Sequence, residues 1–384
     1  MLSVSVVGGG PVGLMVACLL SPFYHVVVYE KRDSYKRVHE LKVTDDVIDE
    51  LVAYCDGSTT LSDLSTLLIK WKNSCITTMS IERELRDILG TIGVDVVKRW
   101  IVDPSELKTD IIIACDGAHS SIRRALHKYL TRDPSYNVPE LVDRHLLGYM
   151  MKMSSTTSLY TTPRRLISGV VYNTPLMMNG LEVDDEWFHA TSRTDFSREV
   201  SLYLPISRQL YQLLREKSWT MATLKEPSSE VNMLLLDHLS RYQINLELRG
   251  GSVMDEIIGV FPLSGYRASS VSYISNNNTN AVFLVGDASS RLTYRRGLKK
   301  GWREACYLAK QLMESATTAR ITNFLDLEHA AGNYQEFCTE LYQQEFAIIN
   351  HAKKYKNSGN STLALTVIGV LSLAAVGLAW VLRR

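Results

Sequence analysis

The fold of this chain is decided near its start, by Val4-Ser5-Val6-Val7-Gly8-Gly9-Gly10-Pro11-Val12-Gly13-Leu14. The valines favour a buried strand and the glycines a tight turn, and the apolar run that follows predicts a helix ending before Pro22. A second apolar run, His25–Tyr29, predicts another strand, which ends in Glu30. The stretch therefore predicts a β-α-β unit at the N-terminus.

The first turn of this unit has the pattern Gly8-x-Gly10-x-x-Gly13. Gly8 permits the tight turn, Gly10 lets the backbone approach a pyrophosphate, and Gly13 lets the helix pack against the sheet. The helix start offers free N–H groups and a positive dipole end, and Glu30 could accept hydrogen bonds from ribose hydroxyls. A glycine turn in any doubly wound protein is the alternative. The strand, the helix and the acid at this spacing favour a nucleotide site.

The composition of the chain limits the classes of fold and function that are possible. A chain of 384 residues allows two domains or one large one, and 46% apolar with 22% charged residues is typical of a folded protein. The net charge of +1 gives no indication of a nucleic-acid partner. Six cysteines without CxxC or metal spacing indicate reduced core residues in a cytosolic protein, and no metal site is predicted. No signal peptide is predicted, because no basic segment precedes the first apolar run.

The C-terminus differs from the rest. Residues 362–382 carry no charge and are long enough to cross a bilayer as a helix. Lysines precede the span, two arginines follow it, and Trp380 lies near one end, where an interfacial aromatic belongs. A buried core helix is the alternative, but this segment has no polar face. We expect a single-pass tail anchor in a lipid bilayer with the folded part in the cytosol, either in the mitochondrial outer membrane or in a bacterial inner membrane.

Two further stretches are informative. Residues 108–124 predict an apolar strand that ends in Asp116-Gly117, followed by a turn and a helix start with two arginines. Residues 281–290 predict a second such strand, which ends in Gly286-Asp287. A basic turn over 291–301 and a helix over 302–313 follow. Taken alone, Asp116 is better explained as an ordinary strand exit, and Asp287 as a helix N-cap, than by a binding role.

The remaining elements give the domain boundaries. Alternating polarity between about 145 and 255 predicts an inserted, mixed β-sheet domain. The predicted parts are a Rossmann-like nucleotide-binding domain over 1–145 and 256–330, the inserted domain over 146–255, a helical segment over 331–360 and the tail over 361–384. Smaller expectations are helices over 43–54, 58–68, 82–89, 208–217, 231–242 and 324–354, and strands over 76–81, 94–97 and 199–204.

The three motifs together resemble the single-component flavoprotein hydroxylases, the family of p-hydroxybenzoate hydroxylase and kynurenine monooxygenase. The N-terminal GxGxxG, the middle stretch Cys115-Asp116-Gly117-Ala118-His119-Ser120-Ser121-Ile122-Arg123 and the late Gly286-Asp287-Ala288 occur in the family's order. An inserted sheet between the last two also matches, and the resemblance covers roughly residues 1–330.

The resemblance implies an FAD-binding fold of the α/β class. Asp287 would bind the flavin's ribityl chain, and Asp116 would support both FAD and a transient nicotinamide. Arg83 follows a predicted strand where the family often places an arginine near the flavin. The implied cofactor-binding residues are Gly8, Gly10, Pro11, Val12, Gly13, Glu30, Lys31, Arg83, Asp116, Gly117, Gly286, Asp287 and Gly297. The catalytic residues stay unknown, because no His, Ser or Cys arrangement indicates a general base.

The resemblance also implies a reaction. NADPH or NADH would reduce FAD, the reduced flavin would react with O2 to give a peroxyflavin, and one oxygen atom would pass to an aromatic or lipid-like small molecule held by the inserted sheet. The family's kynurenine monooxygenase is similar in carrying a C-terminal membrane segment.

One stretch departs from the family pattern. Where the family has a glycine-rich GxGxN turn at the flavin ring, this chain is shorter, with Arg295 for one glycine and Lys299 for the asparagine. Glycine allows a close backbone approach that arginine does not. Six basic residues between 291 and 303 could bind cofactor phosphates or lipid headgroups, or form a solvated helix start.

Two alternatives stay open. The first is an FAD-dependent reductase of prenyl or other lipid-like groups, which would oxidise NAD(P)H without oxygen. The second is a membrane-anchored pseudoenzyme that keeps the nucleotide fold but has lost the flavin-ring site. The changes at Arg295 and Lys299 support the second, and the presence of Glu30, Asp116 and Asp287 opposes it.

Overall fold

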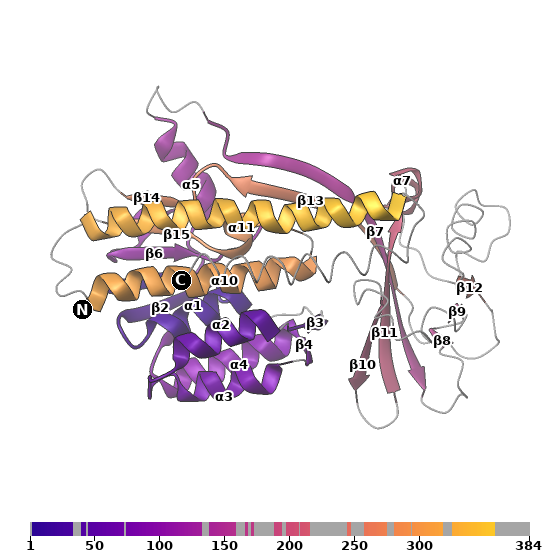
Figure 1. The fold of residues 1–384 in the computed structure, drawn as a ribbon, viewed down its shortest axis with the longest axis horizontal. Helices are drawn as coiled ribbons and strands as arrows, with labels where there is room; N and C mark the ends of the chain where they lie inside the picture. The colour runs from indigo at the N-terminus through magenta and orange to yellow at the C-terminus, as the bar shows by residue number, and fades with distance from the viewer. Residues whose placement is uncertain are drawn as a thin grey trace, which may run out of the picture.

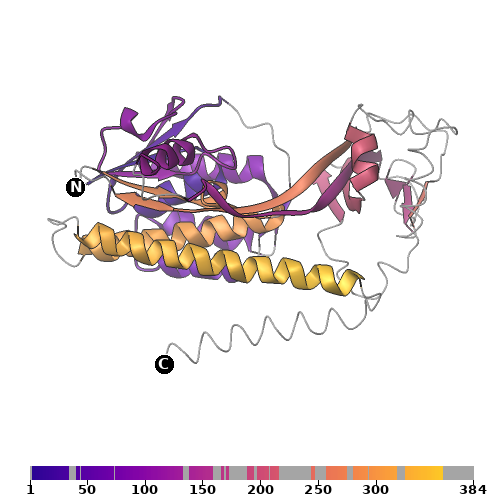
Figure 2. The ribbon, with the colours of Figure 1, turned by 90° about the horizontal axis from the view of Figure 1, so that it is seen from above.

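The computed structural model describes residues 2–33, 40–43, 45–72, 74–132, 138–158, 166–167, 170–172, 188–193, 197–206, 208–215, 244–246, 257–274, 280–292, 294–317 and 325–357. Figures 1 and 2 show two parts, a sheet covered by helices and an outer sheet reached by two long strands.

The main sheet confirms the predicted α/β architecture. Its strand order is β14-β15-β6-β1-β2-β5, and every neighbouring pair is parallel except β14 with β15. The strands are β1 (Ser3–Val7), β2 (His25–Glu30), β5 (Asp95–Lys98), β6 (Ile111–Ala114), β14 (Ser272–Ile274) and β15 (Ala281–Leu284). The central strands β6 and β15 are apolar and buried throughout, as expected for a parallel sheet that is covered on both faces.

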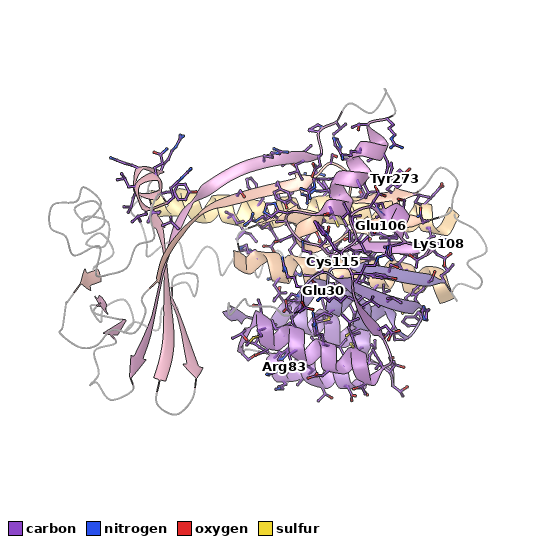
Figure 3. All side chains as sticks on the ribbon, turned by 180° about the vertical axis from the view of Figure 1, so that it is seen from behind. Glu30, Arg83, Glu106, Lys108, Cys115 and Tyr273 are labelled. Atoms are coloured by element: carbon purple, nitrogen blue, oxygen red, sulfur yellow. The ribbon has the colours of Figure 1, made fainter. Side chains whose placement is uncertain are left out.

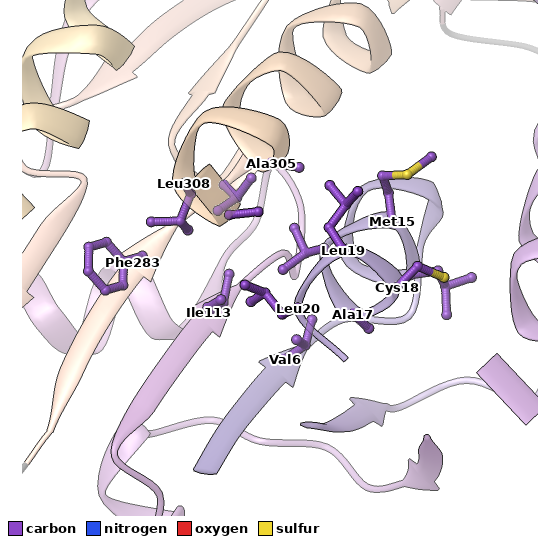
Figure 4. Close-up of a cluster of buried hydrophobic side chains, with 14 of the residues drawn as sticks. Val6, Met15, Ala17, Cys18, Leu19, Leu20, Ile113, Phe283, Ala305 and Leu308 are labelled. Carbon is purple, nitrogen blue, oxygen red and sulfur yellow. The ribbon is translucent and has the colours of Figure 1, made fainter. Parts of the chain in front are cut away.

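Helix α1 (Pro11–Leu20) crosses between β1 and β2 and is apolar all round, so it needs cover on every side. It contacts α4 (Thr78–Thr91) and α10 (Tyr294–Thr317). Figure 4 shows α1 side chains, among them Leu19 and Leu20, packing against Ile113 of β6 and Leu308 of α10. In Figure 1, α2 (Asp45–Cys55), α3 (Ser62–Trp71) and α4 stack beyond α1.

The C-terminal helices differ from the predicted ones in their bounds. The range predicted for one or two helices is the single helix α11 (Leu325–Asn357), which lies along α10 and contacts β14. The predicted start of α10 at residue 302 is wrong, because this helix already begins at Tyr294. The basic turn predicted over 291–301 is therefore helical from 294 onwards. Glycine discouraged a helix prediction here, but Gly297 and Gly301 both have close neighbours, described below.

The outer sheet has the order β10-β11-β7-β13-β16. Strands β7 (Leu141–Ser158) and β13 (Ile257–Ala268) pair over most of their length and run from the main sheet outwards (Figure 2). The predicted boundary between 145 and 146 falls inside β7. The other strands of the outer sheet are β10 (Phe188–Arg193), β11 (Ser197–Ile206) and β16 (Ser290–Arg291). A three-stranded sheet is formed by β8 (Leu166–Ile167), β9 (Val170–Tyr172) and β12 (Ile244–Leu246). A two-stranded sheet is formed by β3 (Glu40–Lys42) and β4 (Cys75–Thr77).

Most of the smaller predictions are confirmed with shifted ends. The predicted helix over 208–217 is α7 (Arg208–Arg215), and the strand over 94–97 is β5. The strand predicted over 76–81 is wrong beyond Thr77, because Thr77 caps α4 by accepting a hydrogen bond from the Ser80 N–H at 3.1 Å. The helix predicted over 231–242 lies outside the described residues.

Among the described helices, none is both long and apolar enough to span a bilayer. The anchor predicted over 362–382 lies outside the described residues.

Candidate functional site

The predicted motifs meet at one edge of the main sheet. Strands β2, β1, β6 and β15 are parallel neighbours in this order. Their carboxyl ends lead into Glu30, the Gly8–Gly13 turn, Asp116 and the Gly286-Asp287 turn. In open α/β sheets, ligands bind at such an edge. Stretches far apart in the sequence therefore form one candidate site.

The glycine turn is close-packed. Gly8 has φ +106°, and a Cβ atom there would lie 2.4 Å from the Cys115 carbonyl oxygen. A Cβ on Gly13 would lie 1.9 Å from the Gly8 carbonyl oxygen. Both distances are shorter than side chains tolerate, and the opposing atoms belong to the backbone. The glycines therefore let β1 and α1 come together beside the end of β6.

The start of α1 is open to an anion. Its N-cap residue, Gly10, has no side chain to cap the first N–H groups, and Pro11 at the first helical position has no N–H to satisfy. The first intrahelical bond runs from the Leu14 N–H to the Gly10 carbonyl, at 3.0 Å. No acidic residue lies in the first turn. Uncapped N–H groups and the helix dipole favour a bound negative charge.

Glu30 is fixed beside this turn. Its carboxylate is buried, with Oε2 accepting from the Gly9 N–H at 2.7 Å and Oε1 from the Arg32 N–H at 2.9 Å. A carboxylate has about four acceptor positions, so it could still accept bonds from a ligand. Lys31 is exposed, and its Nζ lies 5.6 Å from the centre of the Trp100 ring. The structure thus brings Glu30, but not the Lys31 amine, to the glycine turn.

Asp116 begins the turn after β6. Its Oδ2 accepts at 2.7 Å from the N–H of Ser121, the first residue of α5 (Ser121–Leu130), whose N-cap residue is Ser120. Its Oδ1 is buried and has no hydrogen-bond partner among the described residues. Gly117, the next residue, has φ +85°. A buried oxygen without a partner is costly, so a donor from a ligand or water at Oδ1 is expected.

The Gly286-Asp287 turn meets the starts of both α1 and α10. Gly286 has φ +69°, and a Cβ on Gly297 would lie 3.2 Å from Asp287 Oδ1. A Cβ on Gly301 would lie 2.7 Å from Val12 Cγ2. The glycines of α10 thus leave room for the Asp287 carboxylate and for α1.

A buried arginine that was not predicted as a site residue joins the two aspartate turns. Arg123 donates to the carbonyls of Ala118 at 2.9 Å and Ala288 at 3.0 Å. Its Nε donates to Glu140 Oε1 at 2.9 Å. The arginine was visible in the middle motif, but nothing in the local sequence indicates that it reaches the late one.

Tyr266 of β13 makes the same connection. Its hydroxyl lies 2.8 Å from the Ala118 carbonyl oxygen and 2.9 Å from that of Asp287, so its single proton is shared between two acceptors. Burial raises the pKa of Tyr266 to about 12. The long strand β13 is therefore attached directly to the candidate site.

A second group that was not predicted is a buried ion pair under the late turn. Lys300 Nζ lies 2.7 Å from Glu304 Oε1, and both side chains are completely buried. Glu304 accepts from the Gly286 N–H at 2.6 Å and from the Ser289 hydroxyl at 2.8 Å, while Lys300 donates to the Gly286 carbonyl at 3.2 Å. The pair binds the Gly286–Ser289 turn to α10. The i, i+4 spacing was the only sequence signal for it.

Other basic residues of α10 are also paired within the protein. Lys299 and Arg303 lie 2.7 and 2.8 Å from Asp46 Oδ2 of α2, and Arg296 pairs with Glu345 of α11. The sequence suggested that this basic stretch binds phosphates, binds lipid headgroups or is simply solvated. In the structure these residues instead form ion pairs within the protein. The side chain of Arg295 lies outside the described residues.

Arg83 is not part of this arrangement. It is exposed on α4, whereas its neighbour Glu82 is buried. Figure 3 shows Arg83 well apart from Glu30 and Cys115. The structure therefore brings together all the predicted residues except Lys31 and Arg83.

A small cavity lies beside Arg123. It measures about 10 Å³, which is room for about one water molecule. Its lining includes His127, Glu140 and Tyr273. Its size excludes a cofactor.

Comparison with known proteins gives a fold. No protein-family model and no curated protein matches the chain. Among solved structures, the flavin-dependent halogenase CmlS has a TM-score of 0.56 and 14% identity, over 91% of this chain and 63% of CmlS. The tetracycline destructase Tet(51) has a TM-score of 0.53 and 14% identity, over 97% of each chain. CabE, an aromatic hydroxylase from angucycline biosynthesis, has a TM-score of 0.51 and 13% identity, over 89% of this chain and 67% of CabE. The chain thus has the fold of a flavin-dependent halogenase and an aromatic hydroxylase.

Proposed function

We propose that this protein is an FAD-dependent monooxygenase that acts on an aromatic or lipid-like small molecule. One observation carries the proposal: the glycine turn, Glu30, Asp116 and the Gly286-Asp287 turn lie at the carboxyl ends of four neighbouring parallel strands. The fold shared with CmlS and CabE supports it.

The residues present fit FAD. The uncapped start of α1 would hold the pyrophosphate, and the fixed Glu30 carboxylate would accept from the adenosine ribose. Asp287 would accept from the ribityl hydroxyls, with Gly297 leaving it space. The buried Asp116 Oδ1 still needs a donor, which a ligand at this edge could supply.

When bound, FAD would supply the electron transfer and the reaction with O2, with NADPH or NADH as the proposed electron donor. The protein's part is to bind and orient. Arg123 and Tyr266 hold the two aspartate turns together, and the Lys300–Glu304 pair holds the late turn on α10. The sheet built on β7 and β13 would carry the substrate, because β13 reaches from the site to the outer sheet.

A membrane location belongs to the same proposal. The uncharged span over 362–382 supports a tail anchor, which would suit a lipid-soluble substrate. A membrane-pelleting assay of the full chain, before and after alkaline extraction, tests it.

A non-catalytic role is the competing proposal, and one observation favours it. The residues that correspond to the family's glycine-rich turn lie in regular helix from Tyr294, and Lys299 is paired with Asp46. A chain built in this way could bind FAD without placing the ring for oxygen chemistry.

The first experiment is an absorbance spectrum of the purified full chain, followed by a titration with FAD. We expect flavin bands, and we expect Glu30→Gln to raise the Kd for FAD about 10- to 100-fold, because a charged acceptor is lost. Asp49→Asn is the matched control, since Asp49 pairs with Lys72 at the surface of α2. A folded, colourless chain that takes up no FAD would refute the proposal.

NAD(P)H oxidation then separates the two roles. A monooxygenase consumes NAD(P)H and O2 when a substrate is present. An FAD-binding chain whose flavin is not reduced by NADH or NADPH would support the non-catalytic role.

A further inference from the structure

Strand β5 forms an exposed edge of the main sheet. It pairs with β2 on one side and ends the strand order on the other. All four of its residues are exposed, including Val96 at 36% and Val97 at 38%, and Trp100, two residues beyond it, is 61% exposed. An edge strand with apolar side chains is a template for pairing with another strand.

We propose that β5 is a self-association surface, on which a second copy of this chain pairs its own β5 antiparallel about a twofold axis at Val97. The backbone sets which residues can pair. The Arg99 N–H bonds inwards to the Glu30 carbonyl at 3.0 Å. Because successive residues alternate, Val96 and Lys98 direct their N–H and C=O groups to the free edge. These two residues would form a reciprocal hydrogen-bonded pair with Lys98 and Val96 of the second copy.

The side chains select this register. With the axis at Val97, Asp95 lies opposite Arg99 of the second copy and Val97 lies opposite its own counterpart. On the other face, Trp100 is diagonal to Val96 of the second copy. An axis at Lys98 would set two lysines against each other, and an axis at Val96 would set Asp95 opposite Val97. Of these three registers, only the one at Val97 sets opposite charges directly across from each other, although Arg99 Nη2 also lies 3.2 Å from Glu106 Oε2 of its own chain. This complementarity between Asp95 and Arg99 indicates a second copy as the partner.

The contact is small. Stable protein interfaces bury about 1,200–2,000 Å², and a single short strand pair with a tryptophan buries less. The dimer is therefore reversible and depends on concentration, and a covalent trap is the sharpest test.

The test is oxidative crosslinking of the full chain in a mild detergent. At a non-hydrogen-bonded antiparallel pair, Cα atoms lie about 4.5 Å apart, within the range of a disulfide. Val97→Cys should therefore give a crosslinked dimer on a non-reducing gel. Val96→Cys is the control: it lies opposite Lys98, and its own counterpart is beyond the reach of about 7 Å. The unmodified chain, with its native cysteines, gives the background.

A charge exchange tests the register independently by sedimentation velocity. Asp95→Arg and Arg99→Asp each place like charges opposite each other and should raise the dimer Kd at least about tenfold, while Asp95→Arg/Arg99→Asp restores association. A chain that stays monomeric without crosslinking at residue 97 overturns the proposal. Equal crosslinking at 96 and 97, or a dimer that ignores the charge changes, overturns it as well.

Discussion

Two helix starts meet at the carboxyl edge of the main sheet, and they differ in composition. The start of α1 is built from glycine, proline and valine, with no charged residue in its first turn. The start of α10 carries Arg296, Lys299 and Lys300, and each of them pairs with a carboxylate of the protein. At α1 the backbone N–H groups remain available to a ligand, whereas at α10 the charges hold the protein together.

This contrast indicates which of the two helix starts is suited to bind an anion. Basic residues near a nucleotide fold suggest phosphate contacts, but here they join α10 to α2, to α11 and to the late turn. The uncharged start of α1 is the better candidate for a phosphate site, because no side chain caps its first N–H groups and its first turn holds no acidic residue. Substitutions at the two helix starts should therefore have different consequences for the protein.

The largest effect is expected at the buried pair. Lys300→Met leaves Glu304 charged in a dry site and should lower the free energy of unfolding by about 3–5 kcal/mol. Chemical denaturation measures it. Lys300→Met/Glu304→Gln should recover most of the loss, because glutamine keeps an acceptor for the Gly286 N–H without a charge. A loss below about 1 kcal/mol in the single variant would show that the pair is not the support of the late turn.

The next effect is expected at the glycine turn. Gly13→Ala places a Cβ 1.9 Å from the Gly8 carbonyl oxygen, a backbone atom that is costly to displace, and should lower the free energy of unfolding by about 3 kcal/mol. Gly90→Ala is the matched control, since a Cβ there meets nothing within 4 Å and should gain about 0.5–1 kcal/mol in the helix. Thermal unfolding of both variants measures the contrast. Equal stability of the two variants would refute close packing at the turn.

The smallest effect is expected at Tyr266, which lies between the two aspartate turns. Tyr266→Phe should cost about 1 kcal/mol at pH 8 through the lost hydrogen bond. The pKa of Tyr266 is raised from 10.0 to about 12, so the hydroxyl stabilises the fold fully below pH 10 and less as the pH rises through 12. The stability difference between wild type and variant should therefore narrow between pH 10 and 12. A stability difference that stays constant between pH 10 and 12 would contradict the raised pKa of Tyr266.

Local patterns were enough for the parts of the site that lie in one β-α step. Glu30 and the Gly8–Gly13 turn follow from strand, turn and helix periodicity over thirty residues. The aspartates after β6 and β15 follow from the same strand-then-turn pattern. Because parallel strands end at one edge, even their meeting could be predicted.

Local sequence patterns failed to predict the features that depend on contacts between residues far apart in the sequence. The start of α10 looked like a turn, because two glycines and a run of charges outweighed a weak apolar period. Arg83 was predicted from the family resemblance, but it is exposed on α4, whereas the preceding residue, Glu82, is buried, because neighbouring helical residues differ in direction by about 100°.

Sequence alone was sufficient to predict the α/β class, the glycine turn with its acid and the order of the three motifs, because these depend on neighbouring residues. Three contacts could be seen only in the folded chain: Lys300 is buried, Lys299 faces Asp46, and Arg123 reaches the Ala288 carbonyl. The physical reason is that a charge shows its partner only after the helices pack, and Lys299 is separated from Asp46 by most of the chain.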